Sequence, residues 1–203
     1  MIWFARLGPF LGCALLLGAA GAAPPNEKAI AELYARGLAG DAEAVRDCVA
    51  ALEETLAARP ADQLARVYLG SAETLRSRDL PFGLAKWKAL RHGIALMEEA
   101  AAAAPENARV QLLRGVTYEA FPAVLGKAAL ARAALEELVR EVERDPEKLG
   151  RPDRQLLYLN AGEAAKKAGD DARARALWQR GAALAADPRL TAEIHSHLKE
   201  LPQ

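Results

Sequence analysis

The sequence lacks an excess of charge of either sign. It holds 27 basic and 27 acidic side chains in 203 residues, which leaves a formal net charge of +0 at pH 7. Binding to a phosphate backbone generally needs a surplus of lysine and arginine, so we expect no nucleic-acid partner. Hydrophobic residues make up 52% of the chain. That share is enough to bury a core and too high for a chain that is disordered throughout.

Catalytic and metal-binding patterns are also missing. Histidine occurs three times, as His92, His195 and His197. His195 and His197 lie two positions apart, about 200° around a helix, so they cannot hold one metal ion together and we expect surface histidines. No His-Glu-x-x-His, Gly-x-Ser-x-Gly, phosphate-binding glycine loop or paired-cysteine motif occurs. We therefore predict no catalytic residue, no metal and no cofactor, and a protein that is not an enzyme.

The N-terminal segment is nearly free of charge. After Arg6 an uncharged run extends from Leu7 to Ala23, and small residues precede Pro24. This layout is typical of a secretory signal peptide and is too short and too rich in glycine and alanine for a confident membrane span. We predict a signal peptide over residues 1–22, cleaved after Ala22, and a helical repeat domain over residues 23–203 in the periplasm or outside the cell. A lipid anchor at Cys13, or an uncleaved segment that reaches the membrane, remains an alternative.

Cysteine is scarce. If Cys13 leaves with the signal peptide, Cys48 has no partner in the same chain for a disulfide. Its neighbours Val49, Ala51 and Leu52 are apolar. We predict a buried thiol that packs as a small hydrophobic side chain rather than a reactive one.

Strand patterns are absent, and helix patterns take their place. No stretch alternates with a period of two, whereas apolar residues recur at spacings of three and four, as in Val45, Val49, Leu52 and Leu56. Breakers and helix-start residues predict four helix pairs: 26–39 with 42–58, 62–78 with 83–103, 107–120 with 123–144, and 153–168 with 171–186, followed by a last helix over 189–201. The predicted N-caps are Asn26, Asp41, Asp62, Asn107, Asp153 and Asp170.

The breakers are evenly spaced. Pro60, Pro105, Pro146 and Pro188 follow one another at 45, 41 and 42 residues, and Gly70, Gly115 and Gly162 at 45 and 47. A period of this size indicates stacked helix pairs, in which each pair buries its apolar face against the next. The glycines are expected where two helices cross closely.

The last repeat resembles the tetratricopeptide repeat (TPR) family. Tyr158 and Gly162 have the family's spacing in the first helix, Gly169-Asp170 matches its turn, and Ala174, Trp178 and Gly181 match its second helix. The resemblance implies an all-α, right-handed α-solenoid of about four antiparallel helix pairs with a C-terminal capping helix. The two middle hairpins are longer than the family's unit, by about eleven and about seven residues. The segment from Ala85 to Gly115 also resembles bacterial exported proteins with such repeats.

In the TPR family the first helices line a partner-binding groove. The family's offsets place Val67, Ser71, Thr74, Leu112, Val116, Glu119, Leu159, Glu163 and Lys166 there. Such a groove is apolar in its middle and suits an amphipathic helix or an extended apolar segment. The apolar stripe Leu190, Ile194 and Leu198 of the last helix can instead cover it, and both occupants stay open.

The resemblance implies a scaffold that binds a protein or peptide partner, in the assembly or export of envelope components. A structural homo-oligomer is one alternative. A small-ligand protein or enzyme with a cleft near Tyr118 and Glu119 is another. The basic residues Lys86, Lys88, Arg91 and His92 lie mostly off an apolar helical stripe, which comprises Leu84, Trp87, Leu90, Ile94 and Met97. We expect them on a solvated face, with steering of an acidic ligand as the alternative.

Overall fold

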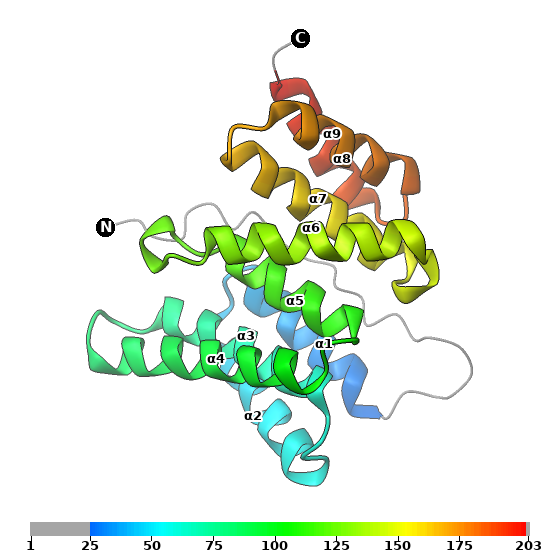
Figure 1. The fold of residues 1–203 in the computed structure, drawn as a ribbon. Helices are drawn as coiled ribbons and strands as arrows, with labels where there is room; N and C mark the ends of the chain where they lie inside the picture. The colour runs from blue at the N-terminus through cyan, green and yellow to red at the C-terminus, as the bar shows by residue number, and fades with distance from the viewer. Residues whose placement is uncertain (1–24, 202–203) are drawn as a thin grey trace. The chain divides into compact units, whose positions relative to one another are not determined.

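The computed structural model describes residues 25–201, and the predicted signal peptide lies outside them. These residues form helices and no strands (Figure 1). The helices are α1 Pro25–Leu38, α2 Ala42–Ala58, α3 Gln63–Asp79, α4 Leu84–Ala103, α5 Ala108–Glu119, η1 Ala123–Leu125, α6 Ala128–Arg144, η2 Pro146–Lys148, α7 Arg151–Lys167, α8 Asp171–Leu184 and α9 Pro188–Glu200. No helix within residues 25–201 combines the length and the apolarity of a membrane span.

The predicted helix pairs are confirmed with one correction. The second helix of the third pair begins at Ala128, not at 123. Residues 123–125 form a 3-10 turn instead, and Gly126 follows with φ 65°, where its N–H donates to the carbonyl of Ala123. A left-handed residue ends a helical turn, and glycine adopts that conformation without steric cost.

Most of the predicted N-caps are confirmed. Asp41 accepts hydrogen bonds from the amides of Glu43 and Ala44, and Asp62 and Asp170 cap α3 and α8 in the same way. Asn107 accepts from Arg109 and Val110 at the start of α5. Each such cap stabilises a helix by about 1 kcal/mol.

Asp153 was wrongly predicted as an N-cap. The helix α7 begins two residues earlier, with Gly150 at the cap position and Pro152 in the first turn. Asp153 is therefore inside the helix and buried. A further cap that the predicted set lacks is Asp187, which accepts from the amides of Arg189 and Leu190 at the start of α9.

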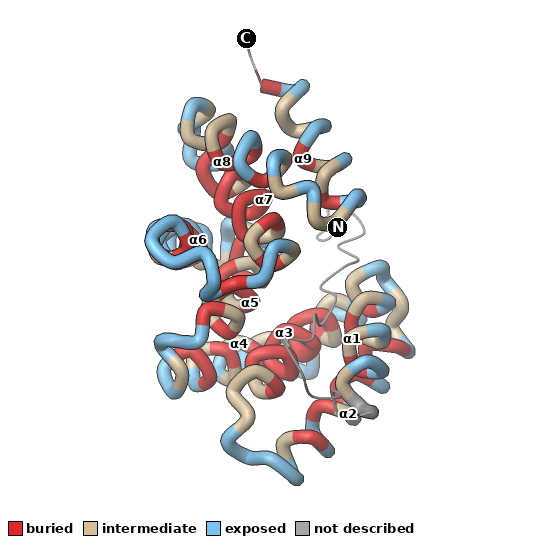
Figure 2. The backbone as a smooth tube through the Cα atoms, turned by 90° about the vertical axis from the view of Figure 1, so that its right-hand side faces the viewer, coloured by how far each residue is buried: buried red, intermediate tan, exposed pale blue. Residues whose placement is uncertain are grey.

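The described chain divides into two compact units, of which the first ends at Arg114 and the second begins at Gly115, inside α5. In the first unit α1 to α4 pack in chain order, and α3 lies along α4. Buried residues extend along most of α3 (Figure 2). This burial is possible because two glycines face each other: a Cβ on Gly70 would lie 2.7 Å from the carbonyl oxygen of Gly93.

In the second unit α6, α7, α8 and α9 pack in chain order. Gly162 leaves room for the ring of Trp178, whose indole N–H donates to the carbonyl of Leu159 at 3.0 Å. A Cβ on Gly115 would lie 2.8 Å from Leu135. Gly70, Gly115 and Gly162 thus all lie at close helix crossings, which confirms the prediction from their spacing.

Candidate functional site

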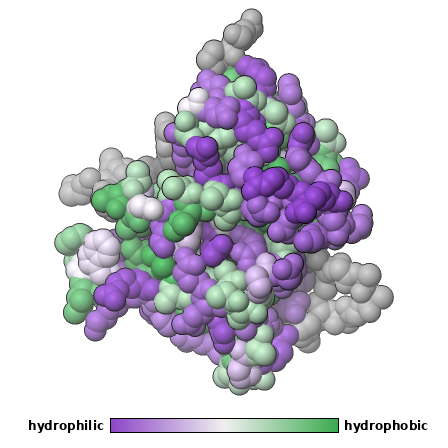
Figure 3. All heavy atoms as spheres, viewed as in Figure 1, coloured by the Kyte–Doolittle hydropathy of each residue, from purple (hydrophilic) through white to green (hydrophobic). Residues whose placement is uncertain are grey.

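Large apolar side chains are exposed where α3 turns into α4. Phe82 is 88% exposed, Leu84 71% and Trp87 43%. We call these three residues the α3–α4 tip. Leu84 and Trp87 are three positions apart at the start of α4, so they share one face of the helix, and Figure 3 shows apolar residues gathered at this end of the hairpin. Clustered apolar exposure is one of the features by which protein-interaction surfaces differ from the rest of a protein surface.

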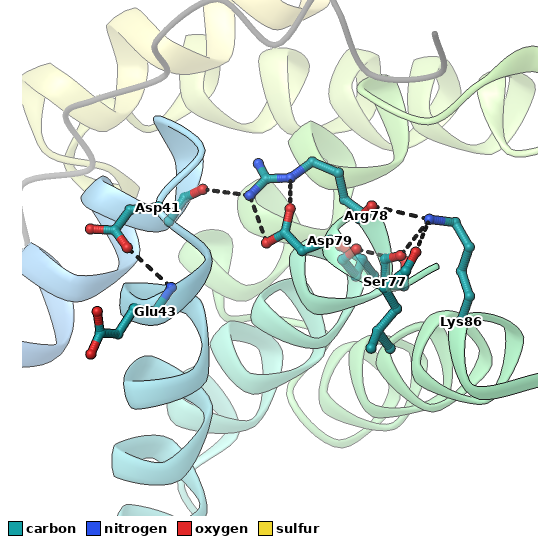
Figure 4. Close-up of polar contacts among 9 residues, drawn as sticks. Asp41, Glu43, Ser77, Arg78, Asp79 and Lys86 are labelled. Atoms are coloured by element: carbon teal, nitrogen blue, oxygen red, sulfur yellow. Dashed lines mark hydrogen bonds and ion pairs between the residues drawn. The ribbon is translucent and has the colours of Figure 1, made fainter. Parts of the chain in front are cut away.

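The tip is held by a cap at the end of α3. Lys86 reaches back from α4 and donates through Nζ to the carbonyls of Ser77 (2.7 Å), Arg78 (3.1 Å) and Leu80 (3.0 Å), as Figure 4 shows. These carbonyls have no partner inside the helix, and a cation at this end is favoured by the helix dipole. The cap fixes the direction in which α4 leaves α3.

The same helix end is also tied to α1. Arg78 donates from Nη2 to the carbonyl of Gly37 at 3.0 Å and pairs with Asp79, with Nε 2.7 Å from Oδ1 (Figure 4). Arg78 is largely buried, with 11% of its side chain exposed. The base of the tip is therefore built from charged groups that are already paired.

The four basic residues near Trp87 differ in their environment. Lys88, Arg91 and His92 are exposed, as expected for a solvated face. Lys86 departs from that expectation because its ammonium group is committed to the end of α3. Lys88 and Arg91 remain beside the tip as positive charges that can meet an acidic group.

Most of the residues predicted to line a groove are covered by the chain itself. In the first unit Val67, Ser71, Thr74 and Leu112 are buried. The hydroxyl of Ser71 lies 2.7 Å from that of Tyr34, and Thr74 donates to the carbonyl of Ser71 at 2.7 Å. Their polar groups are used inside the unit.

In the second unit Glu119 and Leu159 are buried, Val116 and Glu163 are half-buried, and Lys166 is exposed. Lys166 pairs with Asp171 at 2.8 Å. The assignment of the nine residues in the two units to a partner-binding groove remains a prediction.

The last helix caps the second unit, as predicted. Leu190 and Ile194 are buried, and Ile194 fills the space beside Gly181. Gln155 of α7 donates to Thr191 at 2.8 Å and accepts from the amides of Ala186 and Asp187 at 3.0 and 2.7 Å. The side chain of Gln155 therefore fixes both the turn before α9 and its first residues.

Tyr118 and Glu119 are 2% and 4% exposed, so neither is presented to solvent. Lys167 pairs with the carboxylate of Glu119 at 2.5 Å. Burial raises the pKa of Glu119, and Lys167 opposes that rise. Tyr118 packs against Phe121 and lies under the ammonium of Lys127, 4.9 Å from its ring centre. The two side chains support the interior of the second unit.

Cys48 is 1% exposed, and burial raises the pKa of its thiol to about 12. The prediction of an inert, packed cysteine is therefore confirmed. For histidine the result is mixed, because His92 and His195 are exposed, whereas His197 is half-buried and stacks on Trp178. The expected surface position is wrong for His197.

A hollow of about 570 Å³ lies on the second unit between α6 and the α7–α8 turn. Two of the charged side chains that line it pair with each other, since Arg173 donates to both carboxylate oxygens of Glu136 at 3.1 and 2.8 Å. The charges of Arg173 and Glu136 therefore neutralise each other.

No protein-family model matches the sequence, and no curated protein matches it. Among solved structures, the fold is similar to that of a thermophilic TPR protein from Thermus thermophilus. The TM-score is 0.61 at 19% sequence identity, and the match covers 84% of this chain and 81% of that chain. The chain thus has a TPR-like, all-helical fold, which confirms the fold class predicted from its repeats.

Proposed function

We propose that this TPR-like chain is an exported scaffold that binds a protein partner, and that the α3–α4 tip is where the partner docks. Stacked helical hairpins serve in general as protein-interaction scaffolds, because each repeat adds surface without needing an active site. The proposal commits to one surface, the tip formed by Phe82, Leu84 and Trp87.

The exposure of this tip carries the proposal. Burial of exposed apolar surface contributes about 25 cal/mol of favourable free energy for each Å² removed from water. In protein interfaces, a few aromatic side chains commonly contribute most of the binding energy. Lys88 and Arg91 are exposed beside the aromatic Trp87. We infer that the partner offers an apolar segment flanked by acidic residues, whose charges complement this edge.

Export is the second part of the proposal. It is supported by the uncharged run from Leu7 to Ala23 and by the small residues before Pro24. The role that we propose there is the assembly or export of other envelope components. Mass spectrometry of the protein from its own cells should give a chain that begins at Ala23, and a chain that still begins at Met1 contradicts cleavage.

The docking surface is tested with a pair of matched variants. Phe82→Ser/Trp87→Ser removes the tip, while Val124→Ser removes an apolar side chain that is 71% exposed on the second unit. A protein captured from envelope extract is purified, and its affinity for each variant is measured. We expect the double variant to bind at least about tenfold more weakly, since each anchor contributes about 1 kcal/mol or more. Equal affinity for the double variant and the native chain contradicts the proposal.

A homo-oligomer is the second candidate, because the same tip can pack on a second copy of this chain. Light scattering over a range of concentrations distinguishes a homo-oligomer from a chain that binds a different protein. A mass that rises with concentration in the native chain, and not in Phe82→Ser/Trp87→Ser, supports self-association through the tip. A constant monomer mass supports a different protein as the partner.

A further inference from the structure

Three side chains that commonly bind metals meet where α9 packs on α7. They are Glu163 of α7 and Glu193 and His197 of α9, and their donor atoms all lie within 4.8 Å of one another. Glu193 and His197 are four positions apart, so they project from the same face of α9. Two ligands at i and i+4 on one helix, with a third donor from another element, is one arrangement found in zinc sites.

The imidazole of His197 is already oriented. Its ring stacks on Trp178 with centroids 4.8 Å apart and planes inclined by 13°, and Trp178 is itself fixed by its hydrogen bond to Leu159. Nε2 of His197 lies 3.2 Å from Oε1 of Glu163. Two ligands of one tetrahedral zinc ion, each about 2.1 Å from the metal, lie about 3.4 Å apart, close to this spacing.

His197 is the cationic side chain that the described residues place beside both carboxylates, and it is charged only when protonated. Among the residues that the structure describes, neither Glu163 nor Glu193 forms an ion pair with a lysine or an arginine. Glu163 and Glu193 carry like charges, and their donor oxygens lie within 4.8 Å of each other. A divalent ion between them replaces this repulsion by two favourable contacts.

We propose that Glu163, Glu193 and His197 bind one divalent transition-metal ion, with Zn²⁺ as the best fit. An imidazole with two carboxylates suits Zn²⁺, whereas Mg²⁺ and Ca²⁺ need about six oxygen ligands. Three protein ligands leave a fourth position for water. Small rotations of the flexible glutamate side chains bring the donors from their present spacing to bonding distance.

The bound ion fastens the last helix to the body of the second unit. Glu163 belongs to α7, whereas the other two ligands belong to α9, which also lies beside α8 in both views (Figures 1 and 2). Binding is then possible only while α9 is docked, so the metal stabilises the capped state. Glu163, which is also one of the residues predicted to line a groove, lies 3.2 Å from His197 of α9.

Calorimetric titration of the untagged chain with Zn²⁺ tests this site. We expect one ion per chain, an affinity at least about tenfold weaker in Glu193→Gln and in His197→Ala, and no heat of binding with Mg²⁺. His195→Ala is the matched control because this exposed histidine lies two residues away on the same helix, and its affinity should equal that of the native chain.

Three results overturn the proposal: no Zn²⁺ binding to the native chain, unchanged affinity in Glu193→Gln, or equal losses in His195→Ala and His197→Ala. Glu193→Gln keeps the stack of His197 on Trp178, so it serves as the deciding variant if His197→Ala does not fold. Zn²⁺ should raise the melting temperature of the native chain and leave that of Glu193→Gln nearly unchanged, and equal shifts in both also contradict the site.

Discussion

At the scale of single residues, glycines determine how closely two helices can approach each other. The sequence predicts Gly70, Gly115 and Gly162 at crossings because they keep the period of the prolines, and each is found against another helix. Gly93 was not predicted as the partner of Gly70. A pair of facing glycines is invisible to a repeat period, since it depends on the register of α3 against α4.

Gly70→Ala should destabilise the first unit. The added methyl group would lie 2.7 Å from the carbonyl oxygen of Gly93 and from Met97, so the helices must separate. We expect a loss of about 1–3 kcal/mol in the free energy of unfolding, measured with urea. Gly150→Ala is the control, because its Cβ would meet only Pro152 at 3.9 Å. Equal and small losses in both variants count against the close crossing.

Glu73 should make the stability of the first unit depend on pH. It is 1% exposed, and burial raises its pKa although Arg76 and His92 lower it. A carboxyl group with a raised folded-state pKa favours folding below its unfolded pKa of about 4.5, and this contribution is lost as pH rises through the folded value. Glu73→Gln should therefore gain stability relative to the native chain between pH 4.5 and 7, measured by urea unfolding. A difference that stays constant across this range contradicts the pKa shift.

At the scale of helices, most ends follow from local chemistry. Asp41, Asp62 and Asp170 were predicted as caps from their position before apolar periodic segments, and they cap α2, α3 and α8. Asp187 is absent from the predicted caps because the sequence pattern places Pro188 at a break between helices, whereas proline fits well in the first turn of a helix. The break at Gly126 was missed because alanine, valine and leucine around it do not themselves interrupt a helix.

Two alanine variants distinguish the contribution of the N-cap Asp170 to stability from that of the adjacent Asp171. Asp170 accepts from the amide of Arg173, whereas Asp171 makes an exposed ion pair with Lys166. Asp170→Ala should cost about 1 kcal/mol in the free energy of unfolding. Asp171→Ala should cost at most about 0.5 kcal/mol, since exposed ion pairs contribute little. Chemical denaturation of both variants checks the order, and the reverse order contradicts the assigned cap.

The last helix should stabilise the second unit by covering it. Leu190 and Ile194 are buried against α7 and α8, and removal of residues 189–203 exposes Trp178 and the space beside Gly181. We expect the melting temperature to fall by several degrees, as for a loss of a few kcal/mol. Differential scanning calorimetry of the truncated chain measures this, and an unchanged melting temperature refutes the capping role.

At the scale of the whole molecule, the even spacing of the repeats predicts the order of the hairpins. It does not predict which surface remains exposed to solvent. Leu84, Trp87 and Met97 form one apolar stripe in the sequence, yet Met97 is 0% exposed, Trp87 43% and Leu84 71%. Burial along this stripe therefore decreases from the middle of α4 toward its first turn, at the end of the hairpin. The sequence shows the stripe, and the tertiary packing of α4 decides which of its residues are buried.

The predicted groove shows the same limit. Family offsets assign residues by position along a standard repeat, and they do not record the chain's own partners. Ser71 bonds to Tyr34, Glu119 to Lys167 and Glu163 to His197. Such pairings link residues far apart in the sequence, so a single sequence does not reveal them.

Site-specific photo-cross-linking tests the scaffold account most directly. A photoreactive amino acid replaces Phe82 on the α3–α4 tip in one chain and Val124 on the second unit in another. We expect position 82 to cross-link to a single protein, excess purified partner to compete with this product, and position 124 to give none. Cross-linking of equal strength from both positions, or none from position 82, would contradict a docking surface at the tip.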